Sequence, residues 1–404
     1  MPFSPKLPPE LWNLIFVHAT ATDPTFRRLT PFHIELETTL RARPLRFKRS
    51  LILVCKLWHA IALPLLYEIV WMQSPQMAPC FLRTLVESAS PGPQAGYGKW
   101  VRHLILPRPP SLASIQLVDI LKYCPDIHSL SKPSAAVDTN PNFWHGIACT
   151  RSCPTCPALG ALMSLRRVYW ACSSSDEIPH MDGLRLSILL LRAPNLTSLC
   201  MADFGPIGPK FTLHFPENHP LTALTTLEYR ANKALPLRQA DMPNLTHIIA
   251  SPAVLNRFDP SDPNRSSMLS VFGKHLRVIE FPDKTHLTCR GIQDVRSVFH
   301  QCPNLDTLSY NINNTVLPHA DAVLHPSLGV IILRVNPNAP DDVLERCLRM
   351  NVTTFTGGAF PALRRVVLEF DDRWDRPEFS PSYLMMQQRL PLQRVDGAEI
   401  VWEC

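Results

Sequence analysis

Apolar residues recur along most of the chain in one short pattern, in which two aliphatic residues stand three positions apart and a third apolar residue follows two positions later. Because the end of this pattern alternates apolar and variable positions, each copy predicts a short β-strand. Ten copies follow one another at an average spacing of about 29 residues. The copies begin at Val101, Ile127, Leu165, Leu196, Leu224, Leu245, Leu276, Leu305, Leu328 and Leu363, and the copy at Ile127 is degenerate.

Between several of these strands the apolar residues recur at spacings of three and four, which predicts helices. One such pattern follows the pair Asp341-Asp342, which favours a helix start. The four helical patterns are Ile115/Val118/Leu121, Leu184/Ile188/Leu191, Ile292/Val295/Phe299 and Val343/Leu344/Cys347/Leu348. Each repeated unit is therefore expected to be a helix followed by a strand.

Proline makes up 41 of the 404 residues, about twice its usual share, whereas only 14 residues are glycine. Five of the prolines stand at the point where a predicted helix gives way to a predicted strand. Proline cannot continue a helix and holds the preceding residue extended, so it directs the chain into the strand. The junctions are Cys124-Pro125-Asp126-Ile127, Ala193-Pro194-Asn195-Leu196, Met242-Pro243-Asn244-Leu245, Cys302-Pro303-Asn304-Leu305 and Phe360-Pro361-Ala362-Leu363.

This alternation resembles the leucine-rich repeats, which have a period of roughly 20–29 residues. Asn232, Asn313 and Asn336 stand where the pattern of that family expects asparagine. The resemblance implies an α/β fold, an irregular solenoid with parallel strands on its concave face and helices on its convex face. We expect the concave face to carry mixed charge and exposed apolar side chains, which suit a protein partner. These side chains include Ile105, Tyr169, Ile249 and Val367.

Residues 5–72 stand apart from the repeats and predict a small helical module. A first helix is expected from about Pro9 to His18, because proline suits a first turn and apolar residues then recur at helical spacing. A second helix is expected after Ser50, a good N-cap, until Pro64 stops it. Residues 20–48 are rich in Thr, Pro and Arg and are expected to form a long connection with one turn around residues 34–40.

The module resembles the F-box, and in particular the F-boxes of fungal, basidiomycete-type proteins. The resemblance rests on Leu7-Pro8-Pro9-Glu10-Leu11-Trp12 with Ile15-Phe16, on Leu53-Val54-Cys55-Lys56-Leu57-Trp58, and on Pro64-Leu65-Leu66-Tyr67-Glu68. The insertion at residues 20–48 departs from the family pattern. The expected domains are the F-box module at 5–72, a linker or first helix of the array at 73–97, and the repeat array at 98–404.

The F-box resemblance implies a partner, the Skp-type adaptor of a cullin ubiquitin ligase, and through it the cullin. The module is also too small to bury all of its apolar residues without a partner. Carried over residue by residue, the adaptor-binding residues are Leu7, Pro8, Leu11, Trp12, Ile15, Phe16, Leu53, Val54, Cys55, Lys56 and Trp58.

The formal net charge of +6 is spread over the chain, and the densest basic stretch is Arg41–Arg49. Because no basic groove with interleaved aromatic residues accompanies it, we expect no nucleic-acid partner. No apolar stretch approaches the roughly 18 residues that a membrane span needs, and the N-terminus does not resemble a secretory signal. We therefore expect a protein of the cytoplasm or nucleus whose 12 cysteines are reduced.

One group of metal-ligating residues competes with this interpretation. Its centre is Cys153-x-x-Cys156, a spacing that can place two thiolates on one zinc ion. The alternative is an insertion between repeats with buried or free thiols, since no second pair of this kind follows. The residues of the group are His145, Cys149, Cys153, Cys156, Cys172 and His180.

Sequence motifs of catalysis are missing from the chain. It contains no Gly-x-Ser-x-Gly, no His-Glu-x-x-His and no glycine-rich phosphate loop. We therefore expect a protein without enzymatic activity and without a cofactor. The favoured hypothesis is a substrate-receptor subunit of a ubiquitin ligase that binds the adaptor through the F-box and a target protein through the array. The alternatives are a binding scaffold with a vestigial F-box and a zinc-dependent protein.

Overall fold

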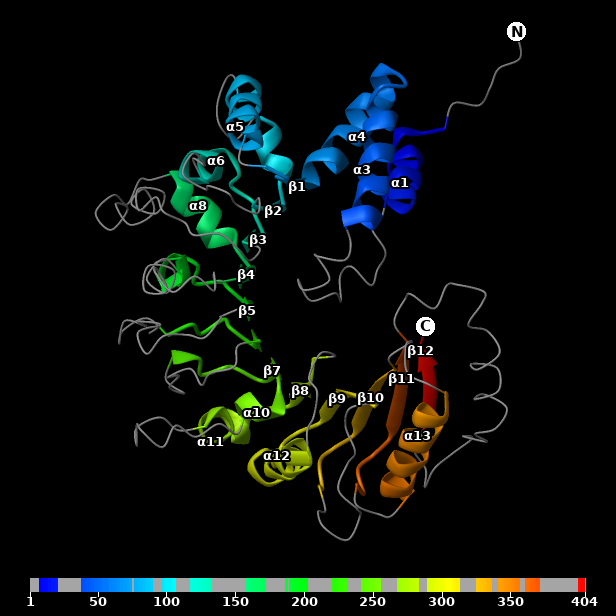
Figure 1. Cartoon of the computed structure of the whole chain (residues 1–404). Helices are drawn as coiled ribbons and strands as arrows, with labels where there is room; N and C mark the ends of the chain where they lie inside the picture. The colour runs from blue at the N-terminus through cyan, green and yellow to red at the C-terminus, as the bar shows by residue number, and fades with distance from the viewer. Residues whose placement is uncertain are drawn as a thin grey trace. The chain divides into compact units, whose positions relative to one another are not determined.

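The structure is a computed structural model of the whole chain (Figure 1). It describes the repeated strands, helices that lie between them and helices of the N-terminal module. These parts are residues 7–20, 38–74, 76–89, 96–106, 117–132, 157–171, 186–187, 189–202, 220–230, 241–255, 267–282, 289–312, 325–335, 341–356, 360–370 and 399–403. Within them, no helix combines the length and apolar character that crossing a lipid bilayer requires.

The chain forms two compact units, which are described separately. Unit 1 comprises Met1–Asp203 with Gly208–His214, and unit 2 comprises Phe204–Ile207 with Phe215–Cys404. Unit 1 holds the N-terminal module and the first strands of the array, and unit 2 holds the later strands. The division therefore falls inside the repeats.

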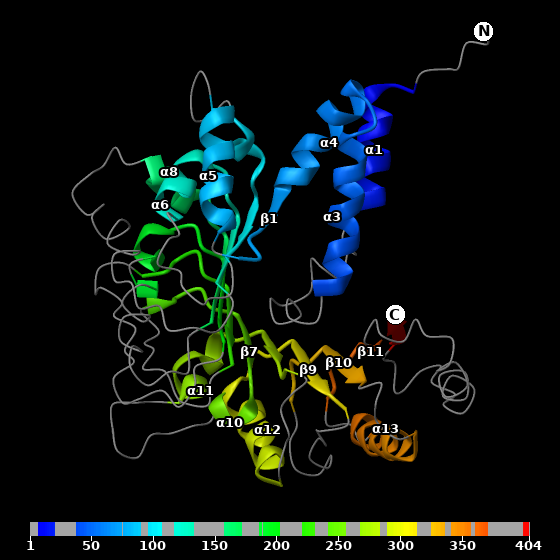
Figure 2. The same cartoon turned by 45° about the horizontal axis from the view of Figure 1, so that its top comes forward.

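In the described residues of the N-terminal module, which belongs to unit 1, there are three helices: α1 (Pro9–Thr20), α3 (Thr38–Ile52) and α4 (Lys56–Glu68). Figures 1 and 2 show them side by side, and α4 packs on both α1 and α3. The start of α1 at Pro9 agrees with the sequence prediction. Its acidic residue Glu10 lies in the first turn, where it favours the positive end of the helix dipole.

The structure differs from the prediction for residues 38–68. Residues 38–48, expected in a connection, belong to α3. The helix was not predicted because its many Arg and Lys residues leave little apolar periodicity in the sequence. Ser50 lies in the last turn of α3, and the N-cap of α4 is Cys55. Pro64 was expected to stop the second helix, but it lies inside α4. Proline removes one backbone hydrogen bond of the helix, and packing of the next residue, Leu65, against the module core offsets this loss.

The array in unit 1 consists of parallel strands in sequence order. Helices α5, α6 and α8 lie on one side of these strands in both views (Figures 1 and 2). The strands are β1 (Ile69–Trp71), β2 (His103–Ile105), β3 (Ser129–Lys132), β4 (Arg167–Ala171) and β5 (Ser198–Ala202). The helices between them are α5 (Met77–Ser88), η2 (Tyr97–Trp100), α6 (Leu117–Tyr123) and α8 (Pro157–Ser164).

Unit 2 repeats the same architecture, and each of its strands pairs in parallel with the strand of the next repeat. The strands are β6 (Thr226–Tyr229), β7 (His247–Ala250), β8 (Val278–Glu280), β9 (Thr307–Asn311), β10 (Val330–Val335), β11 (Arg365–Phe370) and β12 (Glu399–Glu403). The helices are α10 (Pro252–Leu255), α11 (Met268–Phe272), η6 (Gly273–His275), α12 (Cys289–Gln301) and α13 (Asp341–Thr356).

The strand prediction is confirmed at all ten copies of the motif, because a strand begins two residues after the first residue of each copy. The second apolar residue of each copy is buried, from Leu104 in β2 to Val366 in β11. Strands β1 and β12 were not predicted. β1 lies inside the segment assigned to the F-box module, directly after α4.

Hydrogen bonds between repeats set the register of the strands. The carbonyl of Arg166, just before β4, accepts both the Thr197 and Ser198 N–H groups of the next repeat, at 2.8 and 3.0 Å. The Arg277 carbonyl does the same for Asp306 and Thr307, at 2.8 and 2.9 Å. Each strand is thereby held at a defined height relative to its neighbour.

An asparagine after the junction proline adds a side-chain bond to this arrangement. The Nδ2 groups of Asn195, Asn244 and Asn304 donate to backbone carbonyls of the preceding repeat, at 2.8, 2.7 and 2.8 Å. The sequence pattern had placed the characteristic asparagine at other positions, Asn232, Asn313 and Asn336, which lie outside the described residues.

Removing one of these amide groups should destabilise unit 2. Asn304→Ala deletes the bond to the Lys274 carbonyl, so we expect a loss of about 1 kcal/mol in the free energy of unfolding, or about 2–4 °C in melting temperature. His300→Ala, a change of a nearby exposed residue, is the control and should leave the melting temperature unchanged. Equal melting temperatures for both variants, measured by calorimetry, would contradict the role of the amide.

Candidate protein-binding surfaces

Three aromatic side chains form the core of the N-terminal module. The Trp12 and Trp58 ring centroids lie 4.8 Å apart, and the Phe16 ring stands on edge to Trp58 at 4.9 Å. Phe16 is only 2% exposed, and Leu51 and Ala62 are buried beside it. The aromatic residues of the F-box-like motif therefore hold the three helices together.

The same helices expose a second, outward set of apolar side chains. Leu53 is 82% exposed and Val54 58% exposed in the turn between α3 and α4. Nine of the thirteen large apolar side chains that are exposed in the described part of the chain lie in this module, so exposure is concentrated here. These nine residues are Leu7, Leu11, Leu14, Ile15, Val17, Phe47, Leu53, Val54 and Leu57. We call them the apolar surface of the module.

The eleven predicted adaptor-binding residues include both core and exposed side chains. Trp12, Phe16 and Trp58 lie in the module core, and Phe16 is too deeply buried to touch a partner. The other predicted residues are exposed: Leu7, Pro8, Leu11, Ile15, Leu53, Val54, Cys55 and Lys56.

Four residues of the apolar surface were missed: Leu14, Val17, Phe47 and Leu57. The F-box resemblance does not include Leu14, Val17 or Phe47, and it includes Leu57 in its second motif but not among the adaptor-binding residues. Leu57 lies next to Trp58, and one residue along a helix turns the side chain by about 100°. The inward position of Trp58 would therefore have indicated that Leu57 points elsewhere.

The turn between α3 and α4 is held by its own hydrogen bonds. The Leu53 and Val54 N–H groups donate to the carbonyls of Ser50 and Leu51, at 3.1 and 3.3 Å. Cys55 Sγ accepts the Trp58 N–H group at 3.5 Å and so caps α4. These bonds present Leu53 and Val54 to solvent in a defined conformation.

A buried lysine ties α3 to α4 behind this turn. Lys48, from the basic stretch Arg41–Arg49, is buried and donates from Nζ to the Leu65 carbonyl at 3.0 Å. Burial lowers its pKa, while the nearby Glu68 carboxylate opposes the shift. Lys48 is therefore engaged inside the module and does not contribute to a basic surface.

The sheet face opposite the core row differs from the expected concave surface. Ile105, Tyr169, Ile249 and Val367, predicted to be exposed, are all buried. They occupy the second outward position of their strands, and Tyr169 there belongs to a buried cluster with Cys200, its partner on β5. The first outward positions, such as His103 and Arg167, keep more of their surface exposed.

In unit 2 this face carries a network of charged side chains centred on Glu280 of β8. His247 Nε2 lies 2.8 Å from Glu280 Oε1, and Arg334 binds both Glu280 and Glu369, the latter at 3.2 Å. Burial alone raises the pKa of the Glu280 carboxyl, but the His247 hydrogen bond and the Arg334 charge outweigh it and lower the pKa from 4.5 to about 2. The network joins strands β7, β8, β10 and β11.

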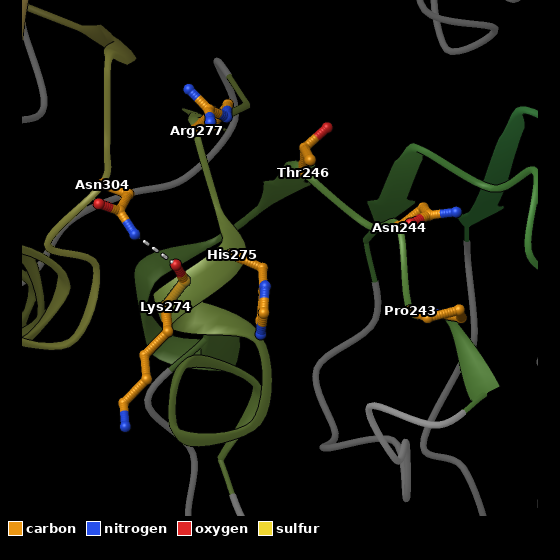
Figure 3. A pocket seen from close by; sticks show the side chains of 7 residues that line it. All are labelled: Pro243, Asn244, Thr246, Lys274, His275, Arg277 and Asn304. Atoms are coloured by element: carbon orange, nitrogen blue, oxygen red, sulfur yellow. Dashed lines mark hydrogen bonds between the residues drawn. The ribbon is translucent and has the colours of Figure 1, made fainter.

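A shallow hollow of about 320 Å³ lies at the start of strands β7 and β8 in unit 2 (Figure 3). Its asparagine amides are engaged in bonds between repeats, as the dashed line from Asn304 to the Lys274 carbonyl shows. Lys274 and Arg277 extend in different directions and do not converge on one point. We assign no ligand to it. The lining residues are Pro243, Asn244, Thr246, Lys274, His275, Arg277 and Asn304.

The candidate zinc ligands His145, Cys149, Cys153, Cys156, Cys172 and His180 lie outside the described residues. In the part of the chain that the structure describes, no three His, Cys, Asp or Glu side chains are grouped so as to hold a metal ion. Two junction cysteines, Cys124 and Cys302, are buried, and burial raises the pKa of each thiol from 9.0 to about 12. Both therefore act as small apolar side chains.

Comparisons with known proteins give little further information. No protein-family model matches the chain, and no curated protein matches its sequence. Among solved structures, the chain is similar to a crystal structure of a Bacteroides fragilis protein from a structural genomics programme, with 14% identity, a TM-score of 0.33 and 71% of each chain covered. A TM-score of this size carries no argument about fold or function.

The Glu280 network should make unit 2 sensitive to acid. Because the folded pKa of about 2 lies below the ordinary 4.5, Glu280 stabilises the fold above pH 4.5, and this contribution is lost as the pH falls toward 2. Glu280→Gln should lower the free energy of unfolding at pH 7 by up to roughly 3 kcal/mol, and the difference should vanish near pH 2.

Glu369→Gln is the matched control, because Glu369 binds the same arginine from a more exposed position. Chemical denaturation at several pH values measures both variants. The interpretation fails if Glu280→Gln costs no more stability than Glu369→Gln at pH 7.

Proposed function

We propose that the chain is a substrate-receptor subunit of an SCF-type cullin ubiquitin ligase. In this function the N-terminal module binds the Skp-type adaptor, and through it the cullin, while the array binds a target protein. The chain itself carries out no chemistry. It raises the effective concentration of the target near the ubiquitin-charged enzyme of the same complex.

The apolar surface of the module is the observation that carries this proposal. Leu11 and Ile15 are one helical turn apart on α1, so they share a side of that helix, and Leu53, Val54 and Leu57 add the α3–α4 turn and the start of α4. Full burial of one such side chain contributes roughly 1.5–3 kcal/mol of favourable free energy. The module alone does not gain this free energy, because these side chains stay in water. An apolar surface of this kind typically marks a protein interface.

The outward residues coincide with the motifs that gave the F-box resemblance. Eight of the eleven adaptor-binding residues implied by that resemblance are exposed beside the core: Leu7, Pro8, Leu11, Ile15, Leu53, Val54, Cys55 and Lys56. A helical module that only stabilised the array would be expected to turn such side chains inward. The exposed position of Leu53 in a hydrogen-bonded turn favours direct contact with the adaptor.

The junction between module and array supports a role in positioning the target. The Tyr67 and Tyr97 ring centroids lie 4.9 Å apart, and Tyr97 stacks on Trp100 at 5.6 Å. The Arg102 N–H group also donates to the Glu68 carbonyl at 3.0 Å. An adaptor bound to the module would therefore be held at a defined place relative to the first strands.

Replacing an exposed apolar residue by a charge should abolish adaptor binding without unfolding the module. Leu53→Asp places a carboxylate where the adaptor would exclude water, so we expect the adaptor to bind at least tenfold more weakly. Binding of the purified adaptor is measured by calorimetry. Val86→Asp, which changes an exposed apolar residue of α5 outside the module, is the matched control and should bind normally.

Trp58→Ala separates loss of contact from loss of fold. Because Trp58 lies in the module core, this variant should lower the melting temperature as well as adaptor binding, whereas Leu53→Asp should leave the melting temperature unchanged. If the folded protein does not bind the adaptor, or if Leu53→Asp binds as tightly as Val86→Asp, the alternative of a scaffold with a vestigial F-box replaces the proposal.

A further inference from the structure

A polar row crosses the first strands of unit 1 on the sheet face opposite the core row. Strand pairing aligns His103, Ser129, Arg167 and Ser198 in this order on β2, β3, β4 and β5. Neighbours in the row stand about 5 Å apart. Arg167 is exposed, and a serine flanks it on each side. Hydroxyl donors and a guanidinium therefore lie within reach of one common ligand group.

Arg167 differs from the other cations near the row that the structure describes, because Arg102, Arg166 and Lys48 are each engaged in a bond. Arg102 is paired with Asp126 Oδ2 at 3.0 Å, and Arg166 donates to the Asn195 carbonyl at 3.1 Å. Lys48 is buried and bonded to the Leu65 carbonyl. Among the described residues, no acidic side chain forms an ion pair with Arg167. Within the described residues, its guanidinium is therefore not neutralised by a carboxylate.

The electrostatics of the row already favour negative charge. Burial is the largest cause that lowers the pKa of His103 from 6.5 to about 4, and the positive surroundings of His128, Arg167, Arg102 and Lys48 lower it further. At neutral pH the His103 ring is therefore uncharged. It leaves Arg167 as the charged donor of the row.

We infer that Arg167, with the hydroxyls of Ser129 and Ser198, binds a carboxylate side chain of an acidic segment in the target protein. The guanidinium offers parallel N–H donors that match the two oxygens of a carboxylate. A single free cation balances the one charge of a carboxylate, whereas a phosphate monoester brings nearly two. This inference rests on the proposed function, because it assigns the chemistry of the target.

The equivalent position of unit 2 lacks these features. Arg365 begins β11 as Arg167 begins β4, but strand pairing places Val330 and Glu399 beside it. It therefore has an acidic neighbour and no hydroxyl at either side. Arg365→Gln removes the same charge from the same strand position and is the matched control for Arg167→Gln.

The test uses the full chain and a fluorescent extended peptide of alternating Glu and Ser. Fluorescence anisotropy should show that Arg167→Gln weakens binding by about tenfold or more, whereas Arg365→Gln changes it little. A control peptide carries Gln in place of Glu. Its affinity for the unchanged chain should be as low as the affinity of the Glu peptide for the Arg167→Gln variant. A third peptide carries phosphoserine in place of Glu.

Two outcomes would overturn the inference. One is equal binding of the Glu and Gln peptides, or equal effects of the two arginine variants. The other is tighter, Arg167-dependent binding of the phosphoserine peptide, which would replace the carboxylate by a phosphate. Adaptor binding is measured on the same variants and should stay normal, so failure of this inference is distinguishable from failure of the proposed function.

Nuclear magnetic resonance of the His103 ring gives a readout independent of affinity. A carboxylate held at Arg167 adds negative charge beside the row, so saturation with the Glu peptide at pH 7, where Glu side chains are ionised, should shift the signals of the His103 ring. The Gln peptide should leave these signals unchanged, and so should the Glu peptide added to Arg167→Gln. Unchanged His103 signals in the normal chain saturated with the Glu peptide would contradict binding at this row.

Discussion

Backbone hydrogen bonds between successive repeats are the constraint on which the rest of the structure depends. A carbonyl before a strand, such as that of Arg166, accepts two N–H groups from the next repeat, and Asn195 returns a side-chain bond to the preceding one. A strand shifted by one residue would turn every side chain to the other face of the sheet. These bonds therefore keep Val168 in the core and Arg167 in the polar row of unit 1.

The N-terminal module obeys a different constraint, because it is too small to surround its apolar residues. Trp12, Phe16 and Trp58 use the available interior, and residues such as Leu53 and Val54 remain outside in a turn held by hydrogen bonds. The same chain thus contains a core that stabilises the module and a surface suited to a partner. Because α4 leads directly into β1, a partner bound there would also be positioned relative to the array.

Local patterns predicted the strands well because each copy of the motif carries its own apolar spacing, and five copies also carry a proline junction. The α3 helix was missed at residues 38–48, since its cationic residues hide the helical period, and Cys55 was not recognised as an N-cap. The predicted adaptor-binding set did not separate core residues from exposed ones. The sequence places Leu11 and Trp12 in one apolar stripe, but it does not show that Trp12 packs against the module core while Leu11 faces solvent. Burial of Ile105 and Tyr169 depends on neighbouring strands, which a local pattern does not describe.

Hydrogen–deuterium exchange of the full chain, with and without the Skp-type adaptor, tests the central claim most directly. If the apolar surface of the module binds the adaptor, the amides of the α3–α4 turn and of the exposed side of α1 should exchange more slowly in the complex. The amides of α13, which belongs to unit 2, serve as the internal reference and should not change. Unchanged exchange around Leu53 and Val54 at a saturating adaptor concentration would contradict the account.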